Sequence, residues 1–440
     1  MPNPVSAAPP KGLVIAAPSS NTGKTVFTLG LVSALRARGV SVEVAKGGPG
    51  DIDPQFLRLA TGQDCYNLDK WAFGESQLRA RAQDISRARD LLIIEGMMGM
   101  FDGAASTSGS SADLADTLDL PVLLLIDASG LAQSIAAIAH GFATLRDRPK
   151  VCGVVATRVG SQRHAELLAE PLEETGIPLL GTVMRSDALT IPSRHLGLVQ
   201  ATERNQTDAL VEAARGAVEQ GVDLDALLDA AGTLPQAPPP RRLPPLGQRI
   251  AVARDIAFEF TYPHILNDWR ANGAEISFFS PLADEAPSDG ADAIFLPGGY
   301  PELHAGQLSN AHRFLSGLRA AADRGALIYG ECGGYMVLGQ GLMDANGVRH
   351  AMAGLLDQST SFAEKKMHLG YRAITPEPNP FWNTALRGHE FHMSVLIDPG
   401  TDAALFQQRD AQGMDLGLTG GQRGSVMGSY THIIDRAPTD

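Results

Sequence analysis

The chain has 440 residues, more than one ordinary hydrophobic core accommodates, and we therefore expect two domains. Its 36 Lys and Arg residues against 49 Asp and Glu residues give a formal net charge of −13, without long basic runs. This charge argues against a nucleic acid or a membrane surface as a partner, because both attract clustered cations. Hydrophobic residues at 44% and 47 glycines favour an α/β protein with many tight turns.

The cysteines and the N-terminal residues bear on the cellular compartment. Cys65, Cys152 and Cys332 lie far apart and form no pair with metal-ligand spacing, so neither a disulfide framework nor a zinc site is indicated. The stretch "MPNPVSAAPP" has no basic or apolar region typical of a signal peptide, and no apolar run reaches membrane-spanning length. We expect a cytoplasmic protein with no membrane partner.

Short apolar segments that alternate with helical stretches predict two open parallel sheets covered by helices. The first set of predicted strands comprises residues 12–17, 41–46, 91–96, 121–127 and 151–159. The rhythm restarts with predicted strands at 249–255, 274–281, 292–299 and 325–331. Repeated prolines between the two sets, at 233–247, predict a semi-rigid linker. The expected domains are therefore 1–232 and 248–440.

The stretch "APSSNTGKT" at 17–25 follows the first predicted strand and runs into a predicted helix. Gly23, Lys24 and Thr25 supply an exposed backbone, a cation for phosphates and a hydroxyl for Mg²⁺, which are the parts of a phosphate-binding loop. Pro18 stands where such loops usually have their first glycine, so the loop is a variant. We expect ATP contacts from Asn21 and Thr22 as well; the alternative is an ordinary capped helix with an exposed Lys-Thr pair.

Carboxylates at the ends of neighbouring strands are candidate ligands for Mg²⁺. Glu95 ends the predicted strand at 91–96, and Asp102 follows on a glycine-rich turn. Asp51 and Asp53 follow the second predicted strand. We expect Mg²⁺ ligands from Thr25, Asp53 and Glu95, and a role for Asp51 and Asp102 in activating a substrate carboxylate. Each of these acids, like Asp127 after the fourth strand, is alternatively a solvated loop residue or a helix cap.

In "GALIYGECGGYMVLG", Cys332 stands on a predicted strand-turn-helix elbow, an arrangement that exposes a nucleophile. Gly330, Gly333 and Gly334 leave room for the sharp turn, and a helix N-terminus favours the thiolate. We therefore predict a catalytic thiol. A buried structural cysteine, the alternative, would not require these glycines, and that simpler interpretation is preferred for the other two cysteines.

A thiol nucleophile also requires an oxyanion hole and a proton acceptor. The amides of Gly298 and Gly299 in "FLPGGYPEL", together with that of Gly333 after the nucleophile, are the predicted oxyanion donors. Histidines 368, 389, 392 and 432 are the candidate bases after the linker. We favour His432, which we expect to end a strand close to the C-terminus and return beside Cys332.

Nine segments in this order resemble the corrinoid a,c-diamide synthases of the cobalamin pathway, and the resemblance spans nearly the whole chain. The segments are "APSSNTGKT", "NLDKWAF", "EGMMGMFDG", "RVGSQRH", "RHLGLVQA", "FLPGGYPEL", "GECGGYMVLG", "HLGYR" and "RGHEFHMS". The family joins an ATP-binding domain similar to dethiobiotin synthetase to a class I-like glutamine amidotransferase domain. Each segment alone is modest evidence, whereas the combination is specific.

The resemblance implies a glutamine-hydrolysing ligase. Glutamine forms a thioester with Cys332, with His432 as base, while ATP phosphorylates the c and a carboxylates of a corrin acid in turn, and ammonia displaces the phosphate. In the common triad a glutamate follows the histidine by two positions, where this chain has Ile434, so a Cys-His dyad is implied. ATP and L-glutamine are the implied co-substrates, with Mg²⁺ as cofactor and a corrinoid as the small-molecule partner.

The chain departs from the family pattern at two places. The family typically has Gly-Pro-Asp-Tyr-Ile-Asp after the second strand, whereas "GPGDID" places Gly50 at the first aspartate and Asp51 at the tyrosine; Asp53 is retained. The asparagine expected before "RVGS" is Thr157, which accepts one hydrogen bond but lacks the paired donor and acceptor of an amide. Thr157 is still the expected adenine contact.

The sequence leaves open several alternatives for the substrate and for the class of protein. The substrate is hydrogenobyrinate or cobyrinate, and "RHLGLVQA" looks more like family members that act on the metal-free ring. A related amidotransferase of the cobyric acid synthase type would amidate other carboxylates of the ring. A regulatory P-loop protein with an inert appended domain is an alternative from another class. The order of amidation and the oligomeric state are also open, a homodimer being one option.

Overall fold

The structure is a computed structural model that describes residues 9–50, 53–104, 108–191 and 204–439. The chain divides into an N-terminal unit that ends at Pro240 and a C-terminal unit from Arg241 to Thr439. The division falls inside the proline-rich segment in which the sequence places a linker.

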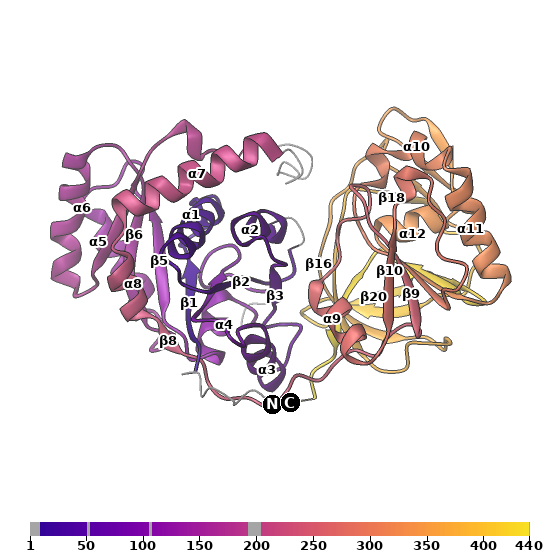
Figure 1. The fold of residues 1–440 in the computed structure, drawn as a ribbon, viewed down its shortest axis with the longest axis horizontal. Coiled ribbons are helices and arrows are strands. Elements are labelled where there is room, and N and C mark those ends of the chain that lie inside the picture. The colour runs from indigo at the N-terminus through magenta and orange to yellow at the C-terminus, as the bar shows by residue number, and fades with distance from the viewer. Residues whose placement is uncertain (1–8, 51–52, 105–107, 192–203, 440) are drawn as a thin grey trace. The chain divides into compact units, whose positions relative to one another are not determined.

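The N-terminal unit is a parallel sheet covered by helices, as the sequence predicts (Figure 1). Its strand order is β3-β2-β4-β1-β5-β6-β7, and β8 pairs with β1 in the antiparallel sense. The strands are β1 (Lys11–Ala16), β2 (Val42–Gly47), β3 (Tyr66–Leu68), β4 (Leu91–Glu95), β5 (Val122–Asp127), β6 (Val151–Val159), β7 (Leu179–Met184) and β8 (Gly232–Thr233). The helices are α1 (Lys24–Ala37), α2 (Asp53–Thr61), α3 (Glu75–Ile85), α4 (Ser111–Thr117), α5 (Ser134–Thr144), α6 (Gln162–Thr175), α7 (Arg204–Gly221) and α8 (Leu224–Ala230).

The central strands of this sheet are buried on both faces, which is why they read as continuous apolar runs. Strand β1 pairs with both β4 and β5, and its residues Leu13 and Ile15 are fully buried. Helix α1 turns Phe27, Leu31 and Leu35 into the same core. Figure 1 shows α7 alongside α1 on that side of the sheet. This packing holds the β1-to-α1 loop and the end of β4 at one edge of the sheet.

Both ends of the proline-rich segment are tied to the units that flank it. Thr233 pairs with Lys11 in the first sheet, so the first residue of the expected linker belongs to that sheet. On the other side, the backbone N–H of Leu243 and the guanidinium of Arg242 donate to the buried carboxylate of Asp268. Ordered backbone thus extends into the segment from both directions.

The C-terminal unit contains a mostly parallel sheet of order β10-β9-β11-β12-β22-β21, in which β21 is antiparallel to β22. Its strands are β9 (Arg249–Ala253), β10 (Glu275–Phe279), β11 (Ala293–Leu296), β12 (Leu327–Glu331), β21 (Gly421–Arg423) and β22 (Val426–Ser429). The helices of this unit are α9 (Pro263–Ala271), α10 (Ala305–Ser309), α11 (His312–Asp323) and α12 (Gly333–Leu338). The four predicted strands of the second set are confirmed as β9 to β12.

Two further sheets correct the expectation that a single open sheet would run to the end of the chain. One has the order β14-β13-β15-β18 and the other β20-β19-β16-β17-β23. Their strands are β13 (Gly341–Met343), β14 (Arg349–Ala351), β15 (Ser359–Ser361), β16 (His368–Pro376), β17 (Leu386–His392), β18 (Val395–Asp398), β19 (Phe406–Arg409), β20 (Asp415–Thr419) and β23 (His432–Arg436). Many of these strands have polar residues on one face, so they lack the apolar runs from which the buried strands were predicted.

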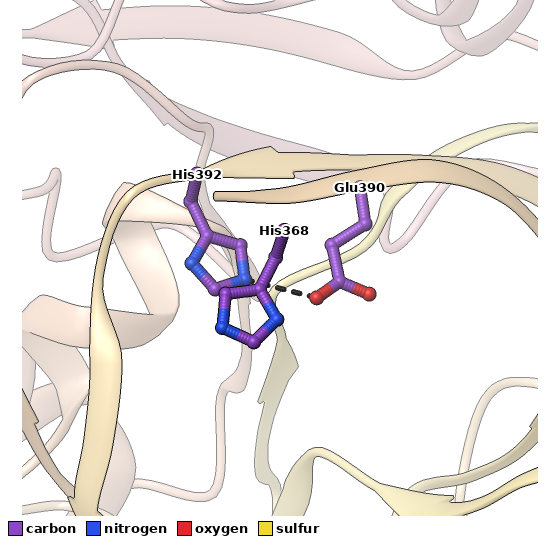
Figure 2. Close-up of side chains that lie close together, drawn as sticks. All are labelled: His368, Glu390 and His392. Carbon is purple, nitrogen blue, oxygen red and sulfur yellow. Dashed lines mark hydrogen bonds and ion pairs between the residues drawn. The ribbon is translucent and has the colours of Figure 1, made fainter. Parts of the chain in front are cut away.

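The antiparallel pair β16 and β17 brings together side chains that are distant in sequence. His368 pairs with His392 across the two strands, and Glu390 lies two residues before His392 (Figure 2). Among the described residues, no helix is both long and apolar enough to cross a membrane.

Candidate active site

The phosphate loop lies between β1 and α1, and its backbone has the shape that exposes amides at a helix N-terminus. Asn21 and Gly23 both have positive φ, 61° and 89°, and Gly23 caps α1 without a side-chain hydrogen bond. The carbonyl of Thr22 accepts a hydrogen bond from the Thr157 hydroxyl at 2.9 Å, which fixes this part of the loop. The predicted loop residues therefore lie where a phosphate would approach the first turn of α1.

Lys24 is folded back across this loop. Its ammonium group donates to the carbonyls of Ser19 at 3.0 Å and Met98 at 2.6 Å, and the residue is only 8% exposed. Burial, followed by the positive charge of Lys46, lowers the pKa of Lys24 to about 8. A bound phosphate would raise the pKa of Lys24 again, because its negative charge would offset both causes. Among the described residues, no carboxylate is hydrogen-bonded to the Lys24 ammonium group.

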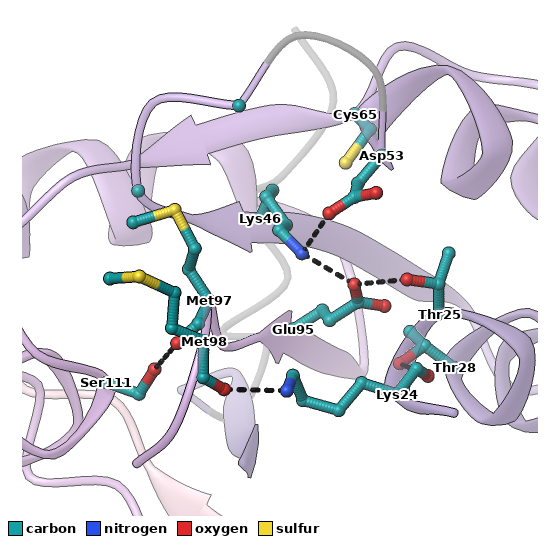
Figure 3. Close-up of polar contacts among 12 residues, drawn as sticks. Lys24, Thr25, Thr28, Lys46, Asp53, Cys65, Glu95, Met97, Met98 and Ser111 are labelled. Atoms are coloured by element: carbon teal, nitrogen blue, oxygen red, sulfur yellow. Dashed lines mark hydrogen bonds and ion pairs between the residues drawn. The ribbon is translucent and has the colours of Figure 1, made fainter. Parts of the chain in front are cut away.

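A buried cation lies between the predicted metal ligands (Figure 3). The ammonium of Lys46, at the end of β2, is 2.6 Å from Asp53 Oδ2 and 2.7 Å from Glu95 Oε1. The Thr25 hydroxyl donates to that same Glu95 oxygen at 2.9 Å. Burial opposes the charge on Lys46, but the two carboxylates outweigh it and raise the pKa of Lys46. The sequence interpretation did not identify Lys46, although its position at the end of a strand, before a glycine pair, was a usable signal.

The donor set around Glu95 fits Mg²⁺, which takes hard oxygen ligands at the C-terminal edge of such sheets. Glu95 is fully buried, and its second oxygen, Oε2, has no hydrogen-bond partner among the described residues. A buried carboxylate oxygen without a donor is costly unless a cation is supplied. Thr25, Asp53 and Glu95 are thus together in space and remain the predicted Mg²⁺ ligands.

A cavity of about 980 Å³ covers this end of the N-terminal unit. Its lining includes every predicted ATP and metal residue, namely Asn21, Thr22, Gly23, Lys24, Thr25, Asp53, Glu95 and Thr157. The Thr157 hydroxyl already donates its hydrogen bond to the carbonyl of Thr22. This side chain can therefore act only as a hydrogen-bond acceptor for a ligand. Its volume is in the range of sites that bind small-molecule ligands.

Two of the acids considered from sequence, Asp102 and Asp127, are not among the residues that line this cavity. Asp102 is not part of the cavity lining, and its Oδ2 accepts from the N–H of Gly99 at 2.9 Å, which closes the turn after β4. Asp127 accepts from the N–H of Ser129 at 2.9 Å and forms an ion pair with Arg158, so it closes the turn after β5 and does not cap α5, whose N-cap is Gln133. Asp51 lies outside the described residues, as does the segment "RHLGLVQA". The roles of Asp51 and Asp102 in carboxylate activation stay predictions.

Cys332 occupies the predicted elbow between β12 and α12. Its backbone has φ 47° and ψ −104°, a conformation that side chains rarely adopt and that is held by the surrounding structure. The N–H of Cys332 donates to Ser429 O at 2.8 Å, and a Cβ on Gly334 would lie 1.9 Å from Leu296 O. The elbow is thus fixed by β22 and β11, and only glycine fits directly under it.

His432 and Cys332 are both close neighbours of Gly298. A Cβ on Gly298 would be 2.3 Å from His432 Cε1 and 3.3 Å from Cys332 Cβ, so the absence of a side chain there allows the imidazole and the cysteine to approach. His432 begins β23, which corrects the expectation that it ends a strand; it follows the turn after β22. Both residues are buried, with 3% of Cys332 and 1% of His432 exposed.

Burial, followed by the nearby His392, lowers the pKa of His432 to about 4. The imidazole is therefore neutral near pH 7 and able to accept the thiol proton. The predicted oxyanion amides are close neighbours, since a Cβ on Gly333 would lie 3.1 Å from the nitrogen of Gly299. The Gly298 carbonyl accepts from Phe260 N–H at 3.0 Å, which fixes the orientation of this turn.

The other candidate histidines occupy different positions. His389 pairs with His432 across β17 and β23, and its ring packs edge-on against Tyr371. His368 and His392 stack on each other with ring centroids 4.7 Å apart. Of the four histidines, His432 is the one placed against Gly298 and Cys332.

These two units define a class of protein: a P-loop nucleotide-binding unit joined to a glutamine amidotransferase unit. Residues 13–199 match the CobQ/CobB/MinD/ParA nucleotide binding domain family. Residues 249–438 match the CobB/CobQ-like glutamine amidotransferase domain family. The predicted fold class is confirmed by both matches.

Curated relatives define the family more narrowly. A hydrogenobyrinate a,c-diamide synthase from Sinorhizobium sp is 52% identical over 97% of this chain and 99% of the relative. Proteins of the same name from Rhizobium meliloti and Brucella abortus are 50% and 49% identical, over 96% and 97% of this chain and 99% and 98% of the relatives. The chain belongs to the hydrogenobyrinate a,c-diamide synthase family, which confirms the resemblance found in its sequence.

Replacement of Lys46 by Met should leave Asp53 and Glu95 facing each other without their shared cation. We expect a loss of about 3 kcal/mol in the free energy of unfolding, measured by urea denaturation, as when a buried ionic cluster loses one of its charges. Added Mg²⁺ should stabilise the variant more than the wild type, because the ion replaces the lost charge. The matched control is Lys150→Met at an exposed position; equal effects of both substitutions would contradict the ion-pair argument.

Replacement of Gly298 by Ala should displace His432, because the added methyl group would overlap its ring. We expect glutaminase activity to fall by about 100-fold, the order of effect of a 1 Å misplacement in a catalytic group. Nucleotide binding by the other unit should be unchanged. Gly306→Ala is the control, since a Cβ there would meet His350 at an ordinary 3.7 Å; unchanged activity in the Gly298 variant would refute this geometry.

The initial rate of glutamine hydrolysis should fall at low pH, with a midpoint near pH 4. The pKa of His432 is lowered to about 4, so its basic form persists as the pH falls through 6.5, the ordinary pKa of histidine. The unfolded chain binds a proton at this residue between those values, so the contribution of His432 to stability decreases over the same range. Initial rates from pH 4 to 8, with circular dichroism at each pH to score folding, test this; a midpoint at pH 6.5 in folded protein would contradict it.

Proposed function

We propose that this chain is an ATP-dependent, glutamine-hydrolysing ligase that amidates the a and c carboxylates of hydrogenobyrinate. The observation that carries the proposal is the presence of two separate sites in one chain. A buried thiol and a neutral imidazole are both neighbours of Gly298 in the C-terminal unit. A phosphate loop with Lys24 and a carboxylate set suited to Mg²⁺ lies in the N-terminal unit. The curated relatives at about half identity support the substrate.

Glutamine hydrolysis follows from the elbow geometry. His432 takes the proton of Cys332, the thiolate attacks the side-chain amide carbon of glutamine, and the amides of Gly299 and Gly333 stabilise the oxyanion. The imidazolium returns the proton to the leaving nitrogen, which departs as ammonia. Water then cleaves the thioester to give glutamate and the free thiol.

The N-terminal unit supplies the leaving group. A carboxylate is a poor acyl donor, so the corrin carboxylate first attacks the γ-phosphorus of ATP, forming an acyl phosphate and ADP. Ammonia then attacks the acyl carbon, and inorganic phosphate leaves as the amide forms. Lys24 would neutralise the transferring phosphoryl group, and Mg²⁺ bound near Thr25, Asp53 and Glu95 would add charge stabilisation. The cytoplasm, inferred from cysteine usage, provides the ATP.

The substrate has two close competitors. Cobyrinate differs from hydrogenobyrinate by the bound cobalt, and the relatives carry the name of the metal-free substrate. A cobyric acid synthase type of enzyme would add more amides to other side chains. A regulatory P-loop protein would hydrolyse no glutamine at all. The number of amides formed on each corrin acid therefore separates these possibilities.

The test is incubation with ATP, Mg²⁺, glutamine and either hydrogenobyrinate or cobyrinate, with amides counted by mass spectrometry. We expect two amides on hydrogenobyrinate. Cys332→Ala should lose glutamine-dependent amidation and retain activity with high ammonium, whereas Lys24→Ala should lose amidation from both nitrogen sources and keep slow glutaminase activity. A wild-type protein that amidates neither corrin acid refutes the proposal, and equal loss of both activities in Lys24→Ala refutes the separation of sites.

A further inference from the structure

The turn that follows β4 holds a methionine in a backbone conformation that favours glycine. Met98 has a φ of 51°, in the left-handed region, where a glycine would lie without strain. Its side chain is 37% exposed, so packing in the core offsets only part of this strain. An exposed methionine alone would need no explanation. A strained one in a ligand cavity points to a contact with the ligand, and Met98 lines the cavity of the N-terminal unit.

The backbone of Met98 has a use that does not depend on its side chain. Its carbonyl accepts from the ammonium group of Lys24 at 2.6 Å, and Lys24 begins α1 directly after the phosphate loop. A glycine at position 98 would present the same carbonyl with less strain. The hydrogen bond to Lys24 therefore explains the conformation of this turn but does not explain why the residue is a methionine.

Met97 adds a second thioether next to Met98. Figure 3 shows the two side chains extending in the same direction. Met97 is partly buried and packs against Gly48, since a Cβ on Gly48 would lie 3.0 Å from both the Sδ and the Cε of Met97. Both methionines line the cavity and form a small apolar surface beside the buried charges of Lys46 and Glu95. Flexible, unbranched thioether side chains adapt well to ligands of irregular shape.

The strand order indicates which ligand reaches this surface. Strand β1, which leads into the phosphate loop, lies between β4 and β5. The predicted metal ligand Glu95 ends β4, whereas Thr157 and Arg185 line the cavity at the ends of β6 and β7, on the other side of the loop. A triphosphate whose terminal phosphate lies at the metal ligands would therefore place its nucleoside toward β6 and β7. The cavity beside Met98 is left for the group that receives the terminal phosphoryl group.

The chemistry of that acceptor fits an apolar surface next to charged groups. Phosphates gain little from a thioether, whereas a corrin acid carries its carboxylates on short side chains around a large, mostly apolar ring. We propose that Met98, supported by Met97, contacts the ring of the corrin acid and so positions one of its carboxylates at the terminal phosphate of ATP. This inference rests on the proposed function and adds a contact for its second substrate. One residue then fixes both partners, because the Met98 carbonyl holds Lys24 while its side chain holds the ring.

The test compares two substitutions that keep the same backbone and differ in side-chain chemistry. Met98→Gln keeps the length of the side chain and makes it polar, whereas Met98→Leu keeps it apolar. We expect the KM for hydrogenobyrinate to rise about 10-fold in Met98→Gln and less than about threefold in Met98→Leu, on the order of one buried apolar contact. The KM for ATP should change less than about twofold in both. Met184→Gln, at a 38% exposed position of the same cavity at the end of β7, is the matched control and should leave the KM for hydrogenobyrinate unchanged.

NMR of protein labelled with ¹³C at the methionine methyl groups tests the contact without turnover. The Met98 signal, assigned by its absence from Met98→Leu, should shift when hydrogenobyrinate is added to protein saturated with Mg²⁺ and a non-hydrolysable ATP analogue. A signal that does not move in a protein that amidates hydrogenobyrinate, or equal KM values in the Gln and Leu variants, overturns the inference and leaves the proposed function standing. A wild type that neither binds nor amidates a corrin acid refutes both together.

Discussion

Parallel strands all end at the same edge of their sheet, and both sites of this protein depend on that constraint. In the N-terminal unit the loop after β1, Lys46 at the end of β2 and Glu95 at the end of β4 meet there because β1 and β2 both pair with β4. In the C-terminal unit the elbow after β12 meets the glycine turn after β11 and the turn after β22 for the same reason. The apolar core determines the order of the strands. The strand order in turn determines which side chains meet at this edge of each sheet.

The two sites resolve the cost of buried polar groups in opposite ways. Around Lys46 the charges are permanent and nearly cancel, so the site is stable before any ligand arrives and needs only small adjustment when phosphate and a cation enter. Around His432 the resting imidazole is neutral, and charge appears only during the reaction. The first site therefore depends on ion pairs that exist in the ground state, whereas the second depends on groups that interact most strongly with the transition state.

The sequence predicted the parts of the fold that have continuous apolar strands, and the sites that follow such strands. Strands β1, β2, β4, β5 and β6 and the elbow at Cys332 were identified because their pattern is local. The strands between β13 and β20 were missed because some, such as β13 and β15, have only three residues and others, such as β18 and β20, are mostly exposed. Lys46 was missed for another reason: its importance comes from partners elsewhere in the chain, Asp53 and Glu95. Only pairing of the strands reveals that these charges are buried together.

Gly50 stands where the family typically has an aspartate, and the charges of the nearby Lys24, Lys46, Asp53 and Glu95 give this difference a physical interpretation. The Asn67 amide donates to the carbonyls of Gly48 and Gly50 at 2.8 and 2.9 Å, so the backbone after β2 is held without help from a side chain at position 50. A Cβ at Gly50 would meet no atom within 4 Å, so its glycine is not imposed by crowding. With Lys24 and Lys46 set against Asp53 and Glu95, the formal charge of these four groups is zero. An additional aspartate would make it negative, which would disfavour the approach of a nucleotide triphosphate until more cation is bound. Gly50 therefore adds no charge to these four groups, and Asn67 holds its carbonyl without any side chain at position 50.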